Sequence, residues 1–249
     1  AAVVQENGEI ICMKKAQSHP ERGAEAVMET MTALIESLDG WQSCEGIGMG
    51  IPGPIDTAAG KIIVSTNLPK LIGFPIAGYI QEHFRKPAYM DNDVKVAALG
   101  EAVQGAGRGM PIVYYVTIST GIGGALVIDQ KVVSGQNGHA GEIGNICIDR
   151  AREKYNILNA GAVENEASGT AITRKGKAVF GDRIQNAGDV FELARSGDEK
   201  AEAIVRDMAY DLAVMFSAIG HVVDPHVFVV GGGVMKGKDV FFDKMEFYY

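Results

Sequence analysis

The placement of glycine limits the possible folds of this chain more than any other sequence feature. The 249 residues include 32 glycines, which follow apolar runs and fill turns and do not form a low-complexity tract. Glycines at such positions mark where short strands and helices begin and end. The pattern therefore predicts an α/β fold, in which strands and helices alternate along the chain.

Hydrophobic periodicity assigns individual elements. Apolar residues at helical spacing predict helices, and short apolar runs bounded by turn residues predict strands. The predicted strands are 2–5, 10–13, 46–50, 112–118, 125–128 and 226–230, and the predicted helices are 23–38, 76–84 and 200–222, with another that starts at Asn92-Asp93. The first two strands meet at Asn7-Gly8, a hairpin signal because both residues tolerate positive φ.

A glycine-rich stretch predicts a division into two domains. Residues 105–111 contain three glycines and a proline, which is typical of a break between structural units. We therefore expect an N-terminal α/β domain, residues 1–106, and a C-terminal α/β domain, residues 107–249.

Charge and cysteine content exclude several classes of protein. The formal net charge is -8, whereas nucleic-acid binding depends on clustered Lys and Arg. Cys12, Cys44 and Cys147 are far apart, which argues against a disulfide framework or a cysteine zinc site. Neither an apolar run long enough to span a membrane nor a signal peptide is visible. We expect a cytoplasmic protein with no nucleic-acid partner and no membrane contact.

The pair Asn92-Asp93 is open to two interpretations. Because both side chains accept hydrogen bonds from the free N–H groups of a first helical turn, the pair is typical of a helix N-cap. The alternative is catalytic: an aspartate within hydrogen-bond reach of a hydroxyl can take its proton as the oxygen attacks a γ-phosphorus. Asn92 could then bond neighbouring hydroxyls with both its donor and its acceptor.

Two glycine turns are equally ambiguous. The run Ser119-Thr120-Gly121-Ile122-Gly123-Gly124 follows a strand and can be a hairpin with a bulge. Its glycines can also let backbone N–H groups approach a phosphate, with the Thr120 hydroxyl as a further donor. Gly231-Gly232-Gly233 can be a strand-to-helix turn or part of the same kind of site.

Glu142 lies between small residues in Gly141-Glu142-Ile143-Gly144. On the surface it would be an ordinary turn acid. If it is buried, an unpaired charge there would need a partner or a ligand.

Taken in order, these motifs resemble the ROK family of sugar kinases and related repressors. The resemblance rests on Asn92-Asp93, the glycine run that begins at Thr120, the Gly141–Gly144 run, and Glu164 followed by Ala167-Ser168-Gly169. It implies an α/β actin-like fold of two ribonuclease-H-like domains with an interdomain cleft. It also implies ATP-dependent phosphorylation of a hexose hydroxyl, with glucose or a related aldohexose as substrate.

The resemblance also implies roles for individual residues. Asp93 would be the general base, and Mg²⁺ would accompany ATP. The implied sugar-binding residues are Gly53, Asn67, Asn92, Asp93, Glu142, Asn145 and Glu164, and the implied nucleotide-binding residues are Thr120, Gly121, Gly123, Gly124, Gly231, Gly232 and Gly233. The family further suggests a homodimer.

Three departures from the family pattern affect these expectations. The family's zinc ligands, one histidine and three cysteines, correspond here to Asn145, Tyr155, Ile157 and Ala162, so no zinc is expected. Asn145 would replace the histidine as a sugar contact. The chain also begins after the family's first phosphate loop and stops before its last helices, so we expect the native protein to be longer.

Two alternatives to the enzyme follow. The chain could be the sugar-sensing effector domain of a ROK transcriptional repressor, or a degenerate sugar-binding protein with impaired catalysis. Upstream residues would separate them, since a strand with Asp-x-Gly-x-Thr indicates a kinase and a basic helix-turn-helix indicates a repressor.

Overall fold

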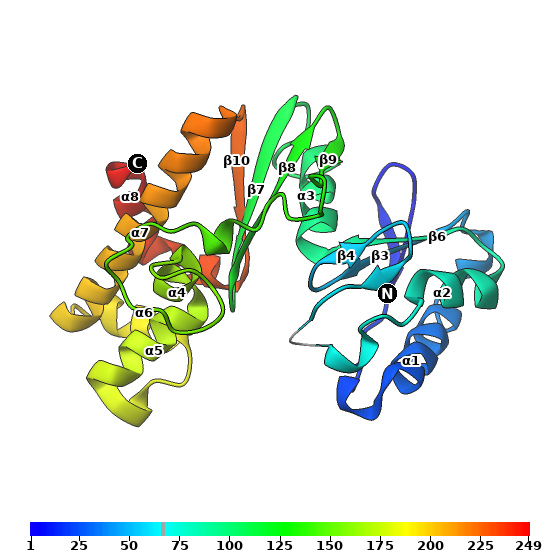
Figure 1. Cartoon of the computed structure of the whole chain (residues 1–249), viewed down its shortest axis with the longest axis horizontal. Coiled ribbons are helices and arrows are strands. Elements are labelled where there is room, and N and C mark those ends of the chain that lie inside the picture. The colour runs from blue at the N-terminus through cyan, green and yellow to red at the C-terminus, as the bar shows by residue number, and fades with distance from the viewer. Residues whose placement is uncertain (66–67) are drawn as a thin grey trace. The chain divides into compact units, whose positions relative to one another are not determined.

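The computed structural model describes residues 1–65 and 68–249, which form two compact units (Figure 1). Unit 1 comprises Ala1–Gly105 and Gly135–His139, and unit 2 comprises Ala106–Ser134 and Ala140–Tyr249. Each unit has its own cluster of buried hydrophobic residues. The chain therefore passes from one unit to the other and back before it completes unit 2.

Unit 1 is built around two parallel strands covered by helices. Strand β3 (Ile47–Ile51) pairs with β6 (Ala88–Asn92), and Met28 of α1 and Ile76 and Ile80 of α2 are fully buried in its core. The other elements are the antiparallel pair β1 (Ala2–Val4) and β2 (Ile10–Met13), the pair β4 (Ile55–Asp56) and β5 (Lys61–Ile62), and the helices α1 (Ala24–Glu36), α2 (Ile76–Phe84) and α3 (Asp93–Val103). Helix α3 begins directly at the carboxyl end of β6, the kind of position where α/β proteins place their sites.

Unit 2 contains a four-stranded mixed sheet in the order β10-β7-β8-β9. Its strands are β7 (Ile112–Ile118), β8 (Ile122–Ile128), β9 (Lys131–Val133) and β10 (Val227–Gly231). Strand β10 is parallel to β7, whereas β7, β8 and β9 form an antiparallel meander. Alternate residues of a strand point to opposite faces, and Tyr114, Val116 and Ile118 of β7 face the main core of the unit.

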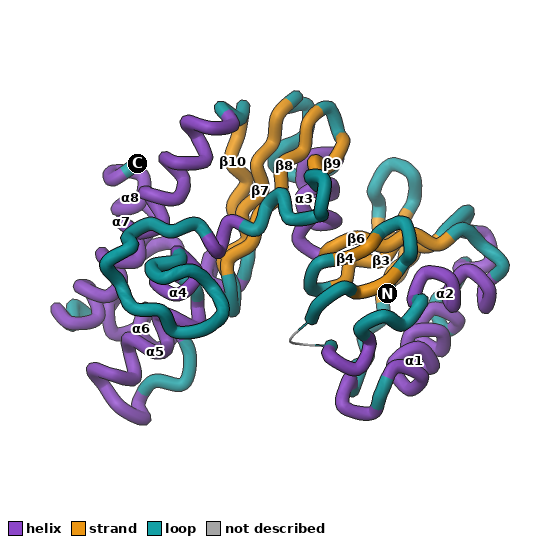
Figure 2. The backbone as a smooth tube through the Cα atoms, viewed as in Figure 1, coloured by secondary structure: helices purple, strands orange, loops and turns teal. Residues whose placement is uncertain are grey.

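Five helices gather against this sheet (Figure 2). They are α4 (Val163–Ala167), α5 (Gly169–Phe180), α6 (Ala187–Arg195), α7 (Glu199–Val223) and α8 (Lys238–Tyr248). Helix α7 contacts each of the other four and buries Met208, Leu212 and Met215 completely. The short 3-10 helices are η1 (Pro20–Arg22), η2 (Trp41–Ser43), η3 (Pro69–Leu71), η4 (Ile143–Asn145), η5 (Gly181–Arg183) and η6 (Gly233–Gly237).

Several expectations from the sequence are confirmed, several other bounds differ by one or two residues, and the start of β8 differs by three. Helix α2 and strand β7 have the predicted bounds, and the hairpin at Asn7-Gly8 is present. Strand β8 begins at Ile122 and not at Ala125, because Gly123 and Gly124 pair with Thr117 and Val116 in the ladder. The helices between 163 and 195 were not predicted, since α5 has few apolar residues.

None of the helices in residues 1–65 and 68–249 has the length and apolar character that crossing a membrane requires.

Candidate functional site

The Asn92-Asp93 pair divides two tasks between its side chains. Asn92 is the N-cap of α3: its Oδ1 accepts hydrogen bonds from the N–H groups of Val94 (2.9 Å) and Lys95 (3.3 Å). Asp93 is the first helical residue, and its side chain is exposed. Its Oδ1 accepts the Val94 N–H at 3.0 Å, and Oδ2 has no hydrogen bond to the described residues. The cap interpretation therefore applies to Asn92, and Asp93 keeps a carboxylate oxygen for other chemistry.

The amide end of Asn92 also holds the turn that contains Gly53. Its Nδ2 donates to Gly53 O at 3.0 Å. Gly53 has φ +104°, and a Cβ atom there would lie 2.3 Å from Val64 O, so only glycine fits. With its carbonyl oxygen used by the cap, Asn92 can offer a ligand its second Nδ2 proton. Asn67, also expected at the sugar, lies outside the described residues.

Glu164 of α4 lies under the turn between β7 and β8. Its Oε2 accepts the Ile122 N–H at 2.8 Å. A Cβ atom at Gly121 would lie 2.5 Å from Glu164 Oε2, and one at Gly144 would lie 3.0 Å from the same atom. The two glycines therefore make room for the carboxylate. In the part of the chain that the structure describes, Oε1 has no hydrogen-bond partner and is the oxygen that Glu164 can present to a ligand.

Glu142 and Asn145 lie at the two ends of the turn around η4. The Glu142 side chain is exposed, and its carbonyl accepts the Asn145 N–H at 3.3 Å. Asn145 in turn holds the following loop: its Oδ1 accepts the Asn159 N–H at 2.7 Å, and its backbone O accepts from Asn159 Nδ2 at 3.1 Å. Unit 2 thus brings Glu142, Asn145 and Glu164 into one neighbourhood, whereas Gly53, Asn92 and Asp93 belong to unit 1.

Several of the expected nucleotide glycines have packing roles. Gly124 is buried within β8 and donates its N–H to Gly141 O at 3.0 Å, so this N–H is not available to a phosphate. A Cβ atom at Gly124 would lie 2.7 Å from Ile143 Cδ1, and one at Gly231 would lie 2.6 Å from the Tyr115 hydroxyl. Glycine at both positions is explained by close packing. Gly123 also lies within the β8 ladder.

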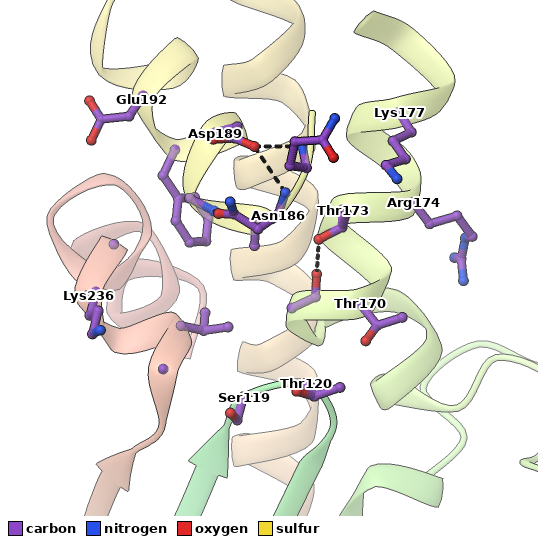
Figure 3. Close-up of a pocket in the computed structure, with 18 of the residues that line it drawn as sticks. Ser119, Thr120, Thr170, Thr173, Arg174, Lys177, Asn186, Asp189, Glu192 and Lys236 are labelled. Atoms are coloured by element: carbon purple, nitrogen blue, oxygen red, sulfur yellow. Dashed lines mark hydrogen bonds between the residues drawn. The ribbon is translucent and has the colours of Figure 1, made fainter. Parts of the chain in front are cut away.

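A pocket of about 920 Å³ opens in unit 2 (Figure 3). Its walls are the turn residues Ser119 and Thr120, one side of α5, the start of α6, and η6. Of the expected nucleotide residues, Thr120 and Gly233 line it; Gly121 and Gly232 are their immediate neighbours. The lining also includes Arg174, Lys177, Arg195 and Lys236 against the carboxylates of Asp189 and Glu192. The excess of cations suits an anionic ligand.

Backbone hydrogen bonds tie the walls of this pocket together. The N–H groups of Gly169 and Thr170, at the start of α5, donate to Ser119 O (2.8 Å) and Thr120 O (3.3 Å). Ser168 caps the same helix by accepting the Ala171 N–H at 3.2 Å. The Ser168-Gly169 run noted in the sequence therefore fixes α5 against the β7–β8 turn.

Asp189 shapes the rim of the pocket. Its Oδ2 accepts the N–H groups of Gln185 (2.6 Å) and Asn186 (3.0 Å), and Asn186 Oδ1 accepts the Gly188 N–H at 2.8 Å. These backbone hydrogen bonds lower the pKa of the Asp189 carboxyl. The sequence analysis missed this rim, although Asn186 and Asp189 have the spacing of a capping box that opens a helix.

The residues at the family's zinc positions have other surroundings in this structure. The Tyr155 ring lies under Arg174, whose Cζ is 3.9 Å from the ring centroid, and the Ile157 side chain is 86% exposed. Among the described residues, no three His, Cys, Asp or Glu side chains are grouped as metal ligands. These residue types do not fit a zinc ion.

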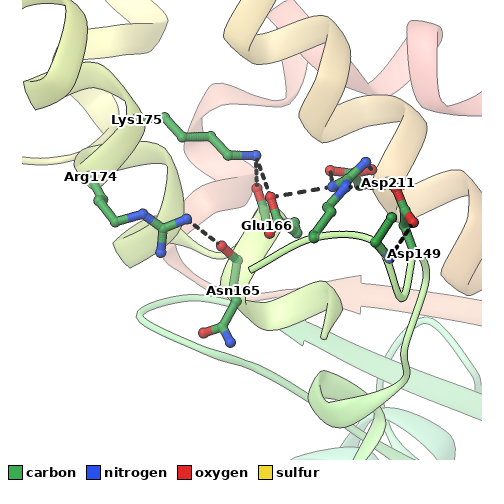
Figure 4. Close-up of polar contacts among 8 residues, drawn as sticks. Asp149, Asn165, Glu166, Arg174, Lys175 and Asp211 are labelled. Atoms are coloured by element: carbon green, nitrogen blue, oxygen red, sulfur yellow. Dashed lines mark hydrogen bonds and ion pairs between the residues drawn. The ribbon is translucent and has the colours of Figure 1, made fainter. Parts of the chain in front are cut away.

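Charged side chains anchor the 146–162 loop to the helices (Figure 4). Arg152 donates to Asp211 through Nη1 (2.7 Å) and Nη2 (2.8 Å), and its Nη1 lies 3.3 Å from Glu166 Oε2. Glu166 also pairs with Lys175 at 3.0 Å. Asp211 is only 1% exposed, and hydrogen bonding to it raises the pKa of Arg152 above its usual range.

Comparison with known proteins agrees with this architecture. The chain belongs to the ROK family, whose model matches residues 1–248. It is 32% identical to a glucokinase from Halalkalibacterium halodurans, over 93% of this chain and 76% of that protein.

Solved structures show the same fold. The ROK hexokinase from Thermus thermophilus superposes with a TM-score of 0.84 at 30% identity, over 98% of this chain and 83% of that one. A ROK family glucokinase from Streptomyces griseus, solved with glucose and AMPPNP, gives a TM-score of 0.79 at 26% identity, over 99% of this chain and 83% of that one. The prediction of an α/β actin-like sugar kinase fold is confirmed, and the relatives named here are sugar kinases.

Proposed function

We propose that this chain phosphorylates a hydroxyl of a hexose, glucose or a related aldohexose, with ATP as donor. Asp93 acts as general base, and Glu142, Glu164, Asn145 and the Asn92 amide bind the sugar. The unit 2 pocket holds the nucleotide. The relatives support this assignment because they include a glucokinase solved with glucose and an ATP analogue.

The observation that carries the proposal is the arrangement at the start of α3. Asn92 supplies the helix cap, so the Asp93 carboxylate is exposed and keeps Oδ2 for a substrate. A carboxylate in that state can accept a hydroxyl proton at Oδ2 as the sugar oxygen attacks the γ-phosphorus, a contribution of about 10² to 10⁴ in rate. Because Asn92 already caps α3, the N-cap does not depend on the Asp93 carboxylate.

The donor site is supported by the chemistry of the pocket. Hydroxyls of Ser119, Thr120 and Thr170 and the cations of Lys177 and Lys236 line one volume, and cations bound to phosphate oxygens make strong charge-assisted hydrogen bonds. Mg²⁺ bound with ATP would neutralise the charge that develops on the transferred group. The free cysteines are consistent with our proposal of a cytoplasmic enzyme. The homodimer is proposed from the family resemblance alone.

ADP release tests the proposal directly. The full-length protein is incubated with Mg-ATP and, separately, with glucose, mannose, N-acetylglucosamine and N-acetylmannosamine, and sugar-dependent ADP is measured. We expect turnover with glucose or another aldohexose. Glucose binding by calorimetry without any ADP release would instead support the repressor effector domain. Absence of both binding and turnover with every sugar would reject the proposal.

A further inference from the structure

Arg174 lies where the pocket meets the segment that carries Glu164. It belongs to α5, is half-buried and lines the pocket. Figure 3 shows its side chain extending from α5 away from Asn186 and Lys236 on the other walls, and Figure 4 shows the same side chain reaching Asn165. Arg174 therefore links the wall of the pocket that α5 forms to α4.

The contacts of Arg174 on the side of α4 are specific. Its Nη2 donates to Asn165 O at 2.7 Å, and its Cζ lies 3.9 Å from the centroid of the Tyr155 ring. Asn165 is 5% exposed, and its side chain exchanges two hydrogen bonds with Asn156, at 3.0 and 3.2 Å. Arg174 thus connects the loop that carries Tyr155 to Asn165 of α4.

The peptide that Arg174 fixes is next to a candidate sugar ligand. Glu164 immediately precedes Asn165 and holds the β7–β8 turn through the Ile122 N–H. A shift of Asn165 O would move the Glu164 carboxylate, because both belong to the same turn of a five-residue helix. The guanidinium has five N–H donors, so it can bond an anion in the pocket and keep its bond to Asn165 O.

We propose that Arg174 is a positioning residue that couples nucleotide binding in the pocket to the sugar affinity of Glu164. This inference rests on the proposed function, since Glu164 has a role in sugar binding only if the chain binds a sugar. A phosphate oxygen that bonds Arg174 orders the guanidinium, which in turn orders Tyr155 and Asn165. The sugar then binds a segment that is already fixed, which gives positive coupling.

Calorimetry with glucose and AMPPNP measures this coupling. In the unmodified chain, saturating AMPPNP with Mg²⁺ should tighten glucose binding by about tenfold, and glucose should tighten AMPPNP binding by the same factor. In Arg174→Met the factor should fall below about twofold. Tyr155 does not line the pocket, so Tyr155→Leu should lose coupling while AMPPNP binding without glucose stays unchanged.

Lys177→Met is the matched control. Lys177 lines the same pocket on the same helix, but its side chain has no hydrogen bond or ion pair with the described residues. It should weaken AMPPNP binding and leave the coupling factor as it is. The inference is overturned if the unmodified chain binds both ligands without coupling, if Arg174→Met retains the factor, or if Lys177→Met loses it equally. An unmodified chain that binds AMPPNP but no sugar would overturn the proposed function as well.

Discussion

Replacing Arg152 by methionine should destabilise unit 2 much more than replacing an equally well-bonded arginine at the surface. Arg152 makes two parallel hydrogen bonds to Asp211, and the side chains are 30% and 2% exposed. Without Arg152, the Asp211 carboxylate is buried with no cation beside it, whereas Glu166 keeps Lys175.

The magnitude follows from this burial. Removing one partner of a buried ion pair costs about 3 to 5 kcal/mol. Because Arg152 is itself partly exposed, we take the lower end, about 3 kcal/mol. A domain of this size loses about 2 to 4 °C in Tm per kcal/mol, so Arg152→Met should melt about 6 to 12 °C lower.

The chain provides a matched control in Arg195. It bonds Asp239 with the same two-point geometry, at 2.6 and 2.7 Å, but the two side chains are 32% and 54% exposed. Water can replace that contact, which contributes at most about 1 kcal/mol, so Arg195→Met should lower Tm by at most about 4 °C. Thermal unfolding at pH 7, followed by circular dichroism, compares the two.

A double variant tests the cause. Arg152→Met combined with Asp211→Leu leaves no unpaired charge at this position, since Glu166 keeps Lys175, and we expect it to recover most of the lost Tm. Equal losses in the two arginine variants, or a double variant no more stable than Arg152→Met, would refute the reasoning.

Three further predictions address the site and the pocket rim. Asp93→Asn should lower kcat by about 10² to 10⁴ while glucose Kd stays within about tenfold, because an amide keeps hydrogen bonds but does not take a proton; near-normal kcat in the ADP-release assay would remove Asp93 from the mechanism. Glu142→Gln and Glu164→Gln should each raise the sugar KM by about one to two decades, since charge-assisted hydrogen bonds contribute about 1.5 to 3 kcal/mol. Tm should fall only for Glu164→Gln, which loosens the bond to the Ile122 N–H, and an unchanged sugar KM in both would reject the assigned pocket. The pKa of Asp189 is lowered in the folded protein by backbone hydrogen bonds, so its stabilisation is complete above the usual pKa of about 3.9 and is lost as pH falls through the lowered value. Between about pH 4 and pH 2, the Tm of Asp189→Asn should therefore fall less than the Tm of the unmodified chain. Equal falls in Tm over this range would contradict this role.

The sequence alone determined the fold class and the order of the motifs. Strong periodicity fixed α2 and β7 at their observed bounds, because a helix or strand with a regular apolar face needs little information from elsewhere in the chain. The Asn92-Asp93 signal was also local, since a cap requires only the first helical turn. What the sequence left open was whether the pair is only a helix N-cap or also offers a carboxylate to a substrate.

The structure gives the two residues different contacts, one of which is distant in sequence. Asn92 is the cap, and it also donates to Gly53 O, which comes 39 residues earlier. The glycines show the same limit. Gly121, Gly124 and Gly231 have the pattern of phosphate turns, but the atoms that a Cβ there would meet first belong to Glu164, Ile143 and Tyr115.

The pocket and the network around Arg152 were decided only by the tertiary structure. The pocket is lined by residues from 119 to 237, and the pair Arg152–Asp211 joins positions 59 apart. A local sequence pattern describes the spacing of residues along one helix or strand, so it does not predict which helices and strands pack together. That choice depends on how α7 packs against the sheet and the other helices of unit 2, because the apolar surface buried there fixes which polar side chains come into reach of one another.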